Sequence, residues 1–170
     1  MCGRFVVTSP TAELVAAFDV QFVGENLPDP SWNIAPTQSV AVVVDSVSRD
    51  RAGQEPARRL EAARWGLVPS WAKDIAIGSK AFNARIETAA EKPMFRSALA
   101  SHRAVVPASG YFEWRMTDNG KIPEYIFSTD GAPLAFAALY SWWRDPTFVG
   151  PAPREWILST TILTRASTGA

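Results

Sequence analysis

The sequence predicts an α+β fold, a single domain dominated by a curled or barrel-like antiparallel sheet with short helices. Short segments rich in valine and aromatic residues, separated by turn-forming residues, predict many strands and few helices. The 170 residues, of which 47% are hydrophobic, suffice for one buried core. No internal repeat or linker divides the chain, so we expect one domain over residues 1–170.

The first half of the chain is expected to contain one helix and a pair of strands. Thr11–Phe18 predicts a short helix, capped by Thr8 or Ser9 and with Pro10 in its first turn. Leu27–Asn33 is broken by prolines and predicts a loop. The other elements expected here are a valine-rich strand at Ser39–Asp45, a polar hairpin loop at Asp50–Arg59 and a return strand at Leu60–Val68.

The second half is expected to be mostly strands. Thr129-Asp130-Gly131 is a strong hairpin signal, which predicts that Glu124–Ser128 pairs with Leu134–Leu139. Met94–Ala100 predicts a short helix. The other expected segments are a loop at Val68–Ser79, the segment Ala81–Arg85, strands at Ala104–Pro107 and Gly110–Met116, and a last long strand at Trp156–Thr164.

Composition excludes several classes of protein. One cysteine and one histidine, Cys2 and His102, cannot form an internal disulfide or supply the roughly four ligands of a Cys/His zinc site. No loop has the acidic spacing of a carboxylate site, so we expect no metal and no cofactor. No apolar run approaches the ~18 residues of a membrane span, and Met1–Phe5 does not begin a signal peptide. We therefore expect a cytoplasmic protein.

Cys2 is the first candidate for chemistry. Removal of Met1 exposes an amine and a thiol on adjacent carbons of one residue. The amine condenses with an aldehyde to an imine, and the thiol then closes a five-membered thiazolidine. An α-amine has a pKa of about 7.7–8.0, so a useful fraction is neutral near pH 7. The alternative interpretation is a small buried thiol near the start of the chain.

Two further residues could assist such a reaction. In a strand, Glu113 shares one face with Tyr111 and Arg115, and its aromatic neighbours would desolvate it, which suits acid–base work. The alternative is a solvent-facing carboxylate paired with Arg115. The side chain of Asn83 can donate a hydrogen bond to an aldehyde or sugar oxygen, or it can simply belong to a turn or helix cap.

The net charge is zero, so contacts with DNA must come from a local patch. Arg4 and Arg85 could bind phosphates, and a surface salt bridge is the alternative interpretation of Arg4. Met94 and Trp114 could stack on bases or belong to the core. The arginine-rich run Arg49–Arg64 is diluted by acidic residues, which predicts a solvated hairpin rather than a DNA-binding patch, and His102 is expected to be structural.

Six ordered segments together resemble one protein family. They are Met1–Phe5 (MCGRF), Trp32–Thr37 (WNIAPT), Trp65–Trp71 (WGLVPSW), Phe82–Thr88 (FNARIET), Met94-Phe95 and Gly110–Trp114 (GYFEW). In this order they resemble the SOS-response-associated peptidase (SRAP) family, the abasic-site processing proteins. The resemblance implies a β-rich fold with a groove for single-stranded DNA that ends at a double-strand junction.

The resemblance also implies roles for particular residues. Cys2 would capture abasic sites covalently, with Asn83 and Glu113 assisting. The DNA contacts that it implies are Arg4, Asn33, Trp71, Arg85, Met94, Trp114 and Thr164. The family carries an active-site histidine in a His-Asp-Arg-Met-Pro motif after the strand that matches Trp156–Thr164, and this sequence ends at Ala170, before that motif. We therefore expect a domain truncated at its C-terminus, and His102 does not take over the role.

The function expected from the sequence is a DNA-damage protein that crosslinks to abasic sites through Cys2. The imine could instead lead to β-elimination, an AP-lyase reaction, and the family's peptidase label suggests self-cleavage that exposes Cys2. The partner expected is single-stranded DNA, bound by a monomer. Two other classes stay open: an N-terminal-cysteine glutamine amidotransferase, which explains only Cys2, and a non-catalytic single-stranded-DNA-binding module.

Overall fold

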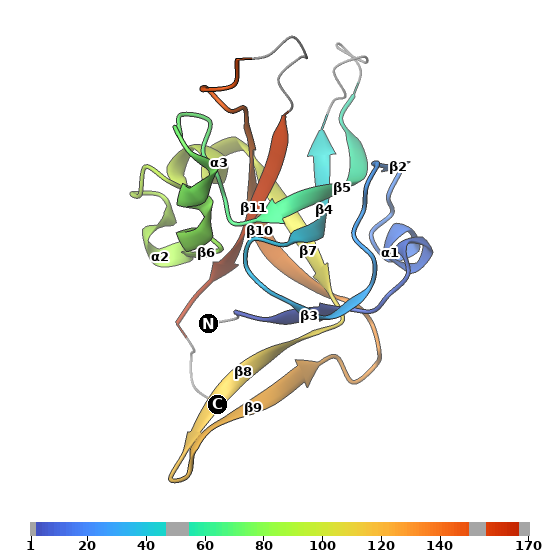
Figure 1. The fold of residues 1–170 in the computed structure, drawn as a ribbon. Helices are drawn as coiled ribbons and strands as arrows, with labels where there is room; N and C mark the ends of the chain where they lie inside the picture. The colour runs from blue at the N-terminus through green and yellow to red at the C-terminus, as the bar shows by residue number, and fades with distance from the viewer. Residues whose placement is uncertain (1–2, 47–54, 150–155, 167–170) are drawn as a thin grey trace.

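A computed structural model describes residues 3–46, 55–149 and 156–166, and its centre is a closed barrel of five strands (Figure 1). In spatial order these are β5 (Ala57–Trp65), β4 (Ser39–Ser46), β7 (Arg103–Ala108), β10 (Leu134–Trp143) and β11 (Ile157–Thr164). Successive strands in this order are antiparallel. A parallel pairing of β11 with β5, in which Thr160 lies opposite Trp65, closes the ring.

Two short strands extend the barrel sheet in parallel. The strand β2 (Phe22–Val23) pairs with β5, and β6 (Asn83–Arg85) pairs with β11. A second sheet has the strand order β3 (Ser31–Ile34), β1 (Phe5–Val7), β8 (Gly110–Thr117) and β9 (Gly120–Phe127). In Figure 1 this sheet lies across one end of the barrel, and the β8–β9 hairpin projects away from it.

The helices of the described residues are short. They are α1 (Thr11–Ala17), the 3-10 helix η2 (Ile75–Lys80), α2 (Ile86–Ala89) and α3 (Arg96–Ser101). The Asp74 carboxylate caps η2 by accepting a hydrogen bond from the Ala76 backbone N–H at 2.8 Å. Figure 1 shows α2, α3 and β6 together on one side of the barrel. The described helices are too short to span a membrane.

The main core lies between the barrel and the second sheet. Phe5 of β1 and Trp65 of β5 are both fully buried, and their rings meet edge to face with centroids 4.9 Å apart. Each fully buried large apolar side chain contributes roughly 1.5–3 kcal/mol by leaving water, so this pair is a strong link between the two sheets. A smaller core holds Leu67, Ala84 and Phe95 and fixes β6 and α3 against β10.

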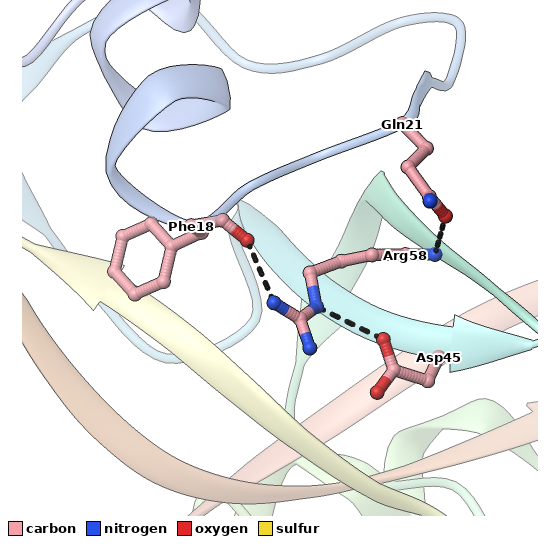
Figure 2. Close-up of polar contacts among 4 residues, drawn as sticks. All are labelled: Phe18, Gln21, Asp45 and Arg58. Atoms are coloured by element: carbon pink, nitrogen blue, oxygen red, sulfur yellow. Dashed lines mark hydrogen bonds and ion pairs between the residues drawn. The ribbon is translucent and has the colours of Figure 1, made fainter.

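Arg58 of β5 joins the end of α1 to the barrel, as Figure 2 shows. Its guanidinium donates to the Phe18 carbonyl oxygen at 3.2 Å and to the Asp45 carboxylate at 3.1 Å. Its backbone N–H donates to the Gln21 side-chain oxygen at 3.0 Å. Hydrogen bonding to Asp45 raises the pKa of Arg58. These contacts support the expectation that the arginine-rich run is not a DNA patch, although Arg49 and Arg51 lie outside the described residues.

Two glycines allow the chain after β5 to cross closely over η2. Gly66 has a φ of +135°, and a Cβ atom there would lie 2.4 Å from the Gly78 carbonyl oxygen. A Cβ atom on Gly78 would in turn lie 2.6 Å from the Gly66 carbonyl oxygen. No other residue fits such a backbone-to-backbone approach without a shift of the chain. The crossing places the segment that begins at Leu67 beside Ala81, just before β6.

The chain after β11 is tied to α2 by one side chain. A Glu87 carboxylate oxygen accepts a hydrogen bond from the Ala166 backbone N–H at 3.0 Å. This bond is the largest cause of a lowered pKa at Glu87, with smaller contributions from Arg85 and Arg165. The ionised carboxylate therefore holds Ala166 beside the end of β6.

The structure confirms the predicted fold class, a β-dominated α+β fold with a barrel, and corrects several local predictions. The expected hairpin at Thr129-Asp130-Gly131 is wrong, because β9 and β10 belong to different sheets. Instead β9 pairs with β8 through a turn before Gly120, where φ is +111°. Turn-forming residues precede β9 as well as β10, so β9 could have formed a hairpin with either β8 or β10. Because β10 is buried in the barrel, β9 pairs with β8.

Three boundaries also differ. Ser31–Asn33 belong to strand β3 rather than to a loop, because β1 offers them a pairing partner. The strand β5 begins at Ala57, so the end of the expected hairpin loop is already paired with β4. The N-cap of α1 is Pro10, and neither Thr8 nor Ser9 caps the helix, since no side chain accepts a bond there. The Thr8 hydroxyl instead bonds to Ser109 at 3.0 Å.

We predict that Trp65→Phe destabilises the protein by about 1–3 kcal/mol, because it removes a buried hydrogen bond and the smaller ring leaves a cavity in the core. The Trp65 indole N–H donates to the Phe82 carbonyl oxygen at 2.8 Å. Urea unfolding followed by circular dichroism measures the change. Trp32→Phe is the matched control, since the Trp32 side chain is 71% exposed and should change stability by less than about 0.5 kcal/mol. Equal effects of the two substitutions would contradict the assigned role of Trp65.

We predict that the Glu87–Ala166 contact is lost in acid. A carboxyl group whose pKa is lowered in the folded state stabilises the fold above its ordinary pKa of about 4.3 and loses that effect as the pH falls through the lowered value. The Ala166 amide resonance should therefore titrate below the usual glutamate range. Glu87→Gln should abolish this titration, and Glu91→Gln should leave it unchanged. An Ala166 amide that is insensitive to pH in the unmodified protein would refute the prediction.

Candidate functional site

Three of the candidate residues meet where β6 pairs with β11. Asn83 lies opposite Ile162, and Arg85 lies opposite Thr164. Ala84 between them is fully buried, so the half-buried Asn83 and the exposed Arg85 point to the other side of this short strand. The structure thus supports the expectation that Asn83 and Arg85 share one face.

The position of Asn83 follows from the barrel itself. The Phe82 carbonyl oxygen accepts a hydrogen bond from the Trp65 indole and another from the Ile162 backbone N–H at 3.0 Å. The Phe82 ring also packs edge to face on Trp65, with centroids 5.8 Å apart. The residue before Asn83 is therefore held from two barrel strands, which fixes where the Asn83 side chain begins.

Two buried hydroxyl groups belong to the elements that adjoin β6. The Thr164 and Thr88 hydroxyl oxygens are buried and make no hydrogen bond to any other described residue. Thr164 is the register partner of Arg85, and Thr88 is in α2, directly after β6. Buried hydroxyls without partners are uncommon in folded proteins and often mark functional positions. Asn83, Arg85 and Thr164 thus form a polar cluster at the end of β11.

Glu113 lies on β8, on the same face as Tyr111 and Arg115. Tyr111 packs against Phe136 of the barrel, with ring centroids 5.7 Å apart, so this face of β8 is the one turned toward the barrel. Glu113 lies directly opposite Glu124 of β9. Arg115 forms its ion pair with Glu124, which argues against the simple alternative in which Glu113 is the partner of Arg115. Two carboxylates are thus gathered near one guanidinium.

Arg4 and Asn33 are brought into direct contact. The Arg4 guanidinium donates to the Asn33 side-chain oxygen at 2.7 Å, and the Arg4 carbonyl oxygen accepts from the Phe112 backbone N–H at 3.0 Å. The register of β1 with β8 places Arg4 beside Phe112, on the face of the sheet turned away from the core. Trp114 shares that face and is 54% exposed. Cys2 lies outside the described residues.

Trp71 and Met94 line a recess of about 150 Å³ beside α3. Trp142 and Ser141 of β10 line it as well, together with His102. No sequence motif marks Trp142, and only its 40% exposure at the end of a barrel strand distinguishes it. Two exposed tryptophans, Trp71 and Trp142, thus lie together at this recess.

His102 is held as a structural residue would be. Its ring meets Tyr140 edge to face with centroids 5.0 Å apart, and one ring nitrogen lies 3.3 Å from the Ser101 hydroxyl oxygen. Its carbonyl oxygen accepts from the Tyr140 backbone N–H at 2.9 Å. Burial raises the pKa of Tyr140. Within the described ranges, no cluster of His, Cys, Asp and Glu could hold a metal ion.

Comparison with known proteins gives the family. The family model described as SOS response associated peptidase (SRAP) matches residues 1–170. The abasic site processing protein YoqW of Bacillus subtilis is 40% identical over 148 residues, covering 86% of this chain and 62% of the relative. The abasic site processing protein YedK of Escherichia coli is 32% identical over 146 residues, covering 83% and 60%. The chain thus spans less than two thirds of the length of these relatives.

Solved structures agree with this assignment. A crystal structure of a Bordetella bronchiseptica protein has a TM-score of 0.76 at 25% identity and covers 98% of this chain and 73% of its own. A Bacteroides thetaiotaomicron protein has a TM-score of 0.75 at 24% identity, with coverage of 96% and 68%, and supports the fold alone. The match over all 170 residues shows that this chain belongs to the SRAP family.

Proposed function

We propose that this protein processes abasic sites in single-stranded DNA by bonding covalently to them through Cys2. One observation carries the proposal: the chain has a single cysteine, at position 2, in a family whose relatives are named abasic site processing proteins. Removal of Met1 would turn that cysteine into an aminothiol. An abasic site exists partly as a ring-opened aldehyde at C1′, which is the partner that an aminothiol prefers.

The reaction proceeds in two steps. The neutral α-amine of Cys2 adds to C1′, and loss of water leaves an imine. The Cys2 sulfur then adds to the imine carbon while the thiol proton goes to the nitrogen, which closes a thiazolidine ring. Both steps move protons, and Glu113 is the carboxylate that we assign to this work as general acid and base. The stable ring shields the site from strand cleavage.

The polar cluster at the end of β11 supports a role in positioning the damaged nucleotide. Asn83 can donate a hydrogen bond to the sugar oxygen, because an amide carries two N–H donors. Arg85 is exposed beside it, and a guanidinium binds a phosphate through two parallel hydrogen bonds. Thr164 lies opposite Arg85 and completes this cluster. Phosphate contacts of this kind fix the strand without reading its sequence.

The exposed aromatic residues suit the neighbouring bases. Trp71 and Trp114 are 58% and 54% exposed, and Met94 lies beside Trp71. Stacking of a base on an aromatic side chain is typically worth about 1–3 kcal/mol and tolerates any sequence. Arg4, held by Asn33, adds a cation on the face of the sheet that carries Trp114. Lyase and self-cleavage activities would share Cys2, since both would begin from the same amine or thiol.

We predict that Cys2→Ala abolishes crosslinking to single-stranded DNA that carries one abasic site. A heat-stable band on a denaturing gel reports the thiazolidine. Cys2→Ser should leave at most a weak, reversible imine, because a hydroxyl closes the ring poorly. Reduction of the aldehyde with borohydride before mixing is the control for aldehyde capture. A stable adduct formed by Cys2→Ala, or undiminished crosslinking to reduced DNA, would refute the mechanism.

We predict that Arg85→Ala weakens binding to single-stranded DNA uniformly across sequences and reduces the salt dependence. Each neutralised phosphate contributes about 0.7 to the logarithmic salt slope on single strands, so the slope should fall by roughly that amount. Arg144→Ala is the control: Arg144 follows Trp143, which pairs with Ile157 at the opposite end of β11 from Thr164. Fluorescence anisotropy at several salt concentrations measures both. Equal losses for the two variants would show that Arg85 has no special contact.

A further inference from the structure

The four-stranded sheet has an outer face, turned away from the barrel, that is apolar along both strands of the β8–β9 hairpin. Register pairs Phe112 with Tyr125, Trp114 with Pro123 and Gly110 with Phe127, and directly opposed residues share a face. Met116 belongs to this face as well. Gly110 and Phe112 are less accessible, and the other residues of this face are exposed, with Phe127 at 58% and Met116 at 70%.

The aromatic side chains of this outer face are held in place before any partner arrives. The Phe112 and Tyr125 ring centroids are 5.2 Å apart, and Tyr125 stacks on Phe127 at 5.4 Å with an interplanar angle of 19°. Tyr125 lies over Gly110, where a Cβ atom would be 2.5 Å from its ring. An ordered row of rings loses little conformational entropy when it is covered, which favours association.

On the part of this face that β8 and β9 form, away from Arg4, the charges favour a protein partner over nucleic acid. On the described strands β8 and β9, Lys121 is the one charged residue of the outer face, at the tip of the hairpin opposite Met116. Arg4 lies at the opposite margin of the face, directly before β1. Two cations at the margins neutralise few phosphates, whereas interface centres are depleted of charge and enriched in aromatic residues and methionine. The chain also has zero net charge, so copies do not repel one another.

We propose that the outer face of the β8–β9 hairpin binds the same face of a second copy of this chain. A two-fold interface places the same patch of the two copies face to face. Because the centre of this patch has no charged residue, the two copies would not bring like charges together there. The alternative contact, edge to edge between two β9 strands, is opposed by Pro123, which has no N–H to donate.

The size of the patch sets the strength of the dimer. Aromatic side chains expose 150–250 Å² each when fully open, so five half-exposed apolar side chains offer roughly 500 Å² per copy. Two copies would bury about 1,000 Å², at the lower limit for a specific interface, which points to a reversible dimer with a micromolar dissociation constant. Trp114 belongs both to this face and to the proposed DNA contacts, so association is measured without DNA.

Sedimentation velocity from about 1 to 300 µM protein, a range that brackets micromolar affinity, tests the proposal. The apparent mass should rise from the 18.6 kDa of one chain toward twice that value. Phe127→Lys, and separately the uncharged Phe127→Ser, should weaken association at least about tenfold. Val23→Lys is the matched control, because Val23 of β2 is 50% exposed on the other sheet and its change should leave association intact.

Two results would overturn the proposal. One is an unmodified chain that stays monomeric over the whole range. The other is association that both folded Phe127 variants leave unchanged, or that Val23→Lys weakens as much as they do. Circular dichroism and thermal unfolding confirm that each variant is folded, and the uncharged variant keeps the test decisive if the lysine variant does not fold.

Discussion

The parallel pairing of β11 with β5 is the constraint on which the rest of the structure depends. It turns a sheet with two open edges into a barrel, so that every barrel strand has partners on both sides. The joint is reinforced where β5 ends: the Gly66 N–H donates to the Thr160 carbonyl oxygen, and the Val68 N–H donates to the Ser159 hydroxyl, both at 2.8 Å. Ser159, Thr160 and Thr161 are all buried in β11. The Ser159 hydroxyl is bonded at this joint, and the Thr160 hydroxyl donates to the Leu139 carbonyl oxygen at 2.9 Å.

Closure of the barrel also builds the candidate site. The edge of β11 beyond the joint is free to pair with β6, which brings Asn83 and Arg85 beside the end of β11. Trp65 connects the two events, since it pairs with Thr160 at the joint and its indole holds the carbonyl group before Asn83. Trp65 thus belongs to the core and also supports the site. A substitution at Trp65 would therefore alter the position of Asn83 in the polar cluster as well as the packing of the core.

The two sheets divide the work expected of a DNA-processing protein. The barrel side carries the polar cluster and the recess with Trp71 and Met94, and the second sheet carries Glu113, Arg4 and Trp114. Rigid strands rather than loops present most of these side chains, which suits chemistry that depends on orientation. The zero net charge fits the same picture: binding would come from a few placed contacts rather than from a general attraction to phosphates.

Local pattern was sufficient for much of this protein. The valine-rich run at Ser39–Asp45 and the alternating segments at Ala104–Pro107 and Gly110–Met116 appear as strands because their side chains fit a half-buried pleated surface wherever it lies. Asn83 and Arg85 share a face because that follows from the period of a strand. The segments that carry the family resemblance are local in the same sense, and the match over the whole chain confirms the family to which they pointed.

Partner choice, by contrast, needed the tertiary structure. Asp130-Gly131 and Asn119-Gly120 are both sequences that favour a hairpin turn. The hairpin forms at Asn119-Gly120, because β10 is buried in the barrel between β7 and β11 and is not available to pair with β9. The sequence alone does not reveal the exposure of the aromatic row on β8 and β9 or the recess beside Trp142. Nor does it reveal that the buried Thr164 hydroxyl has no hydrogen-bond partner among the described residues. The sequence determined which segments are strands and which residues have reactive or binding groups, because those properties are local. The tertiary structure decided which strands pair and which side chains meet, because these depend on residues far apart in the chain.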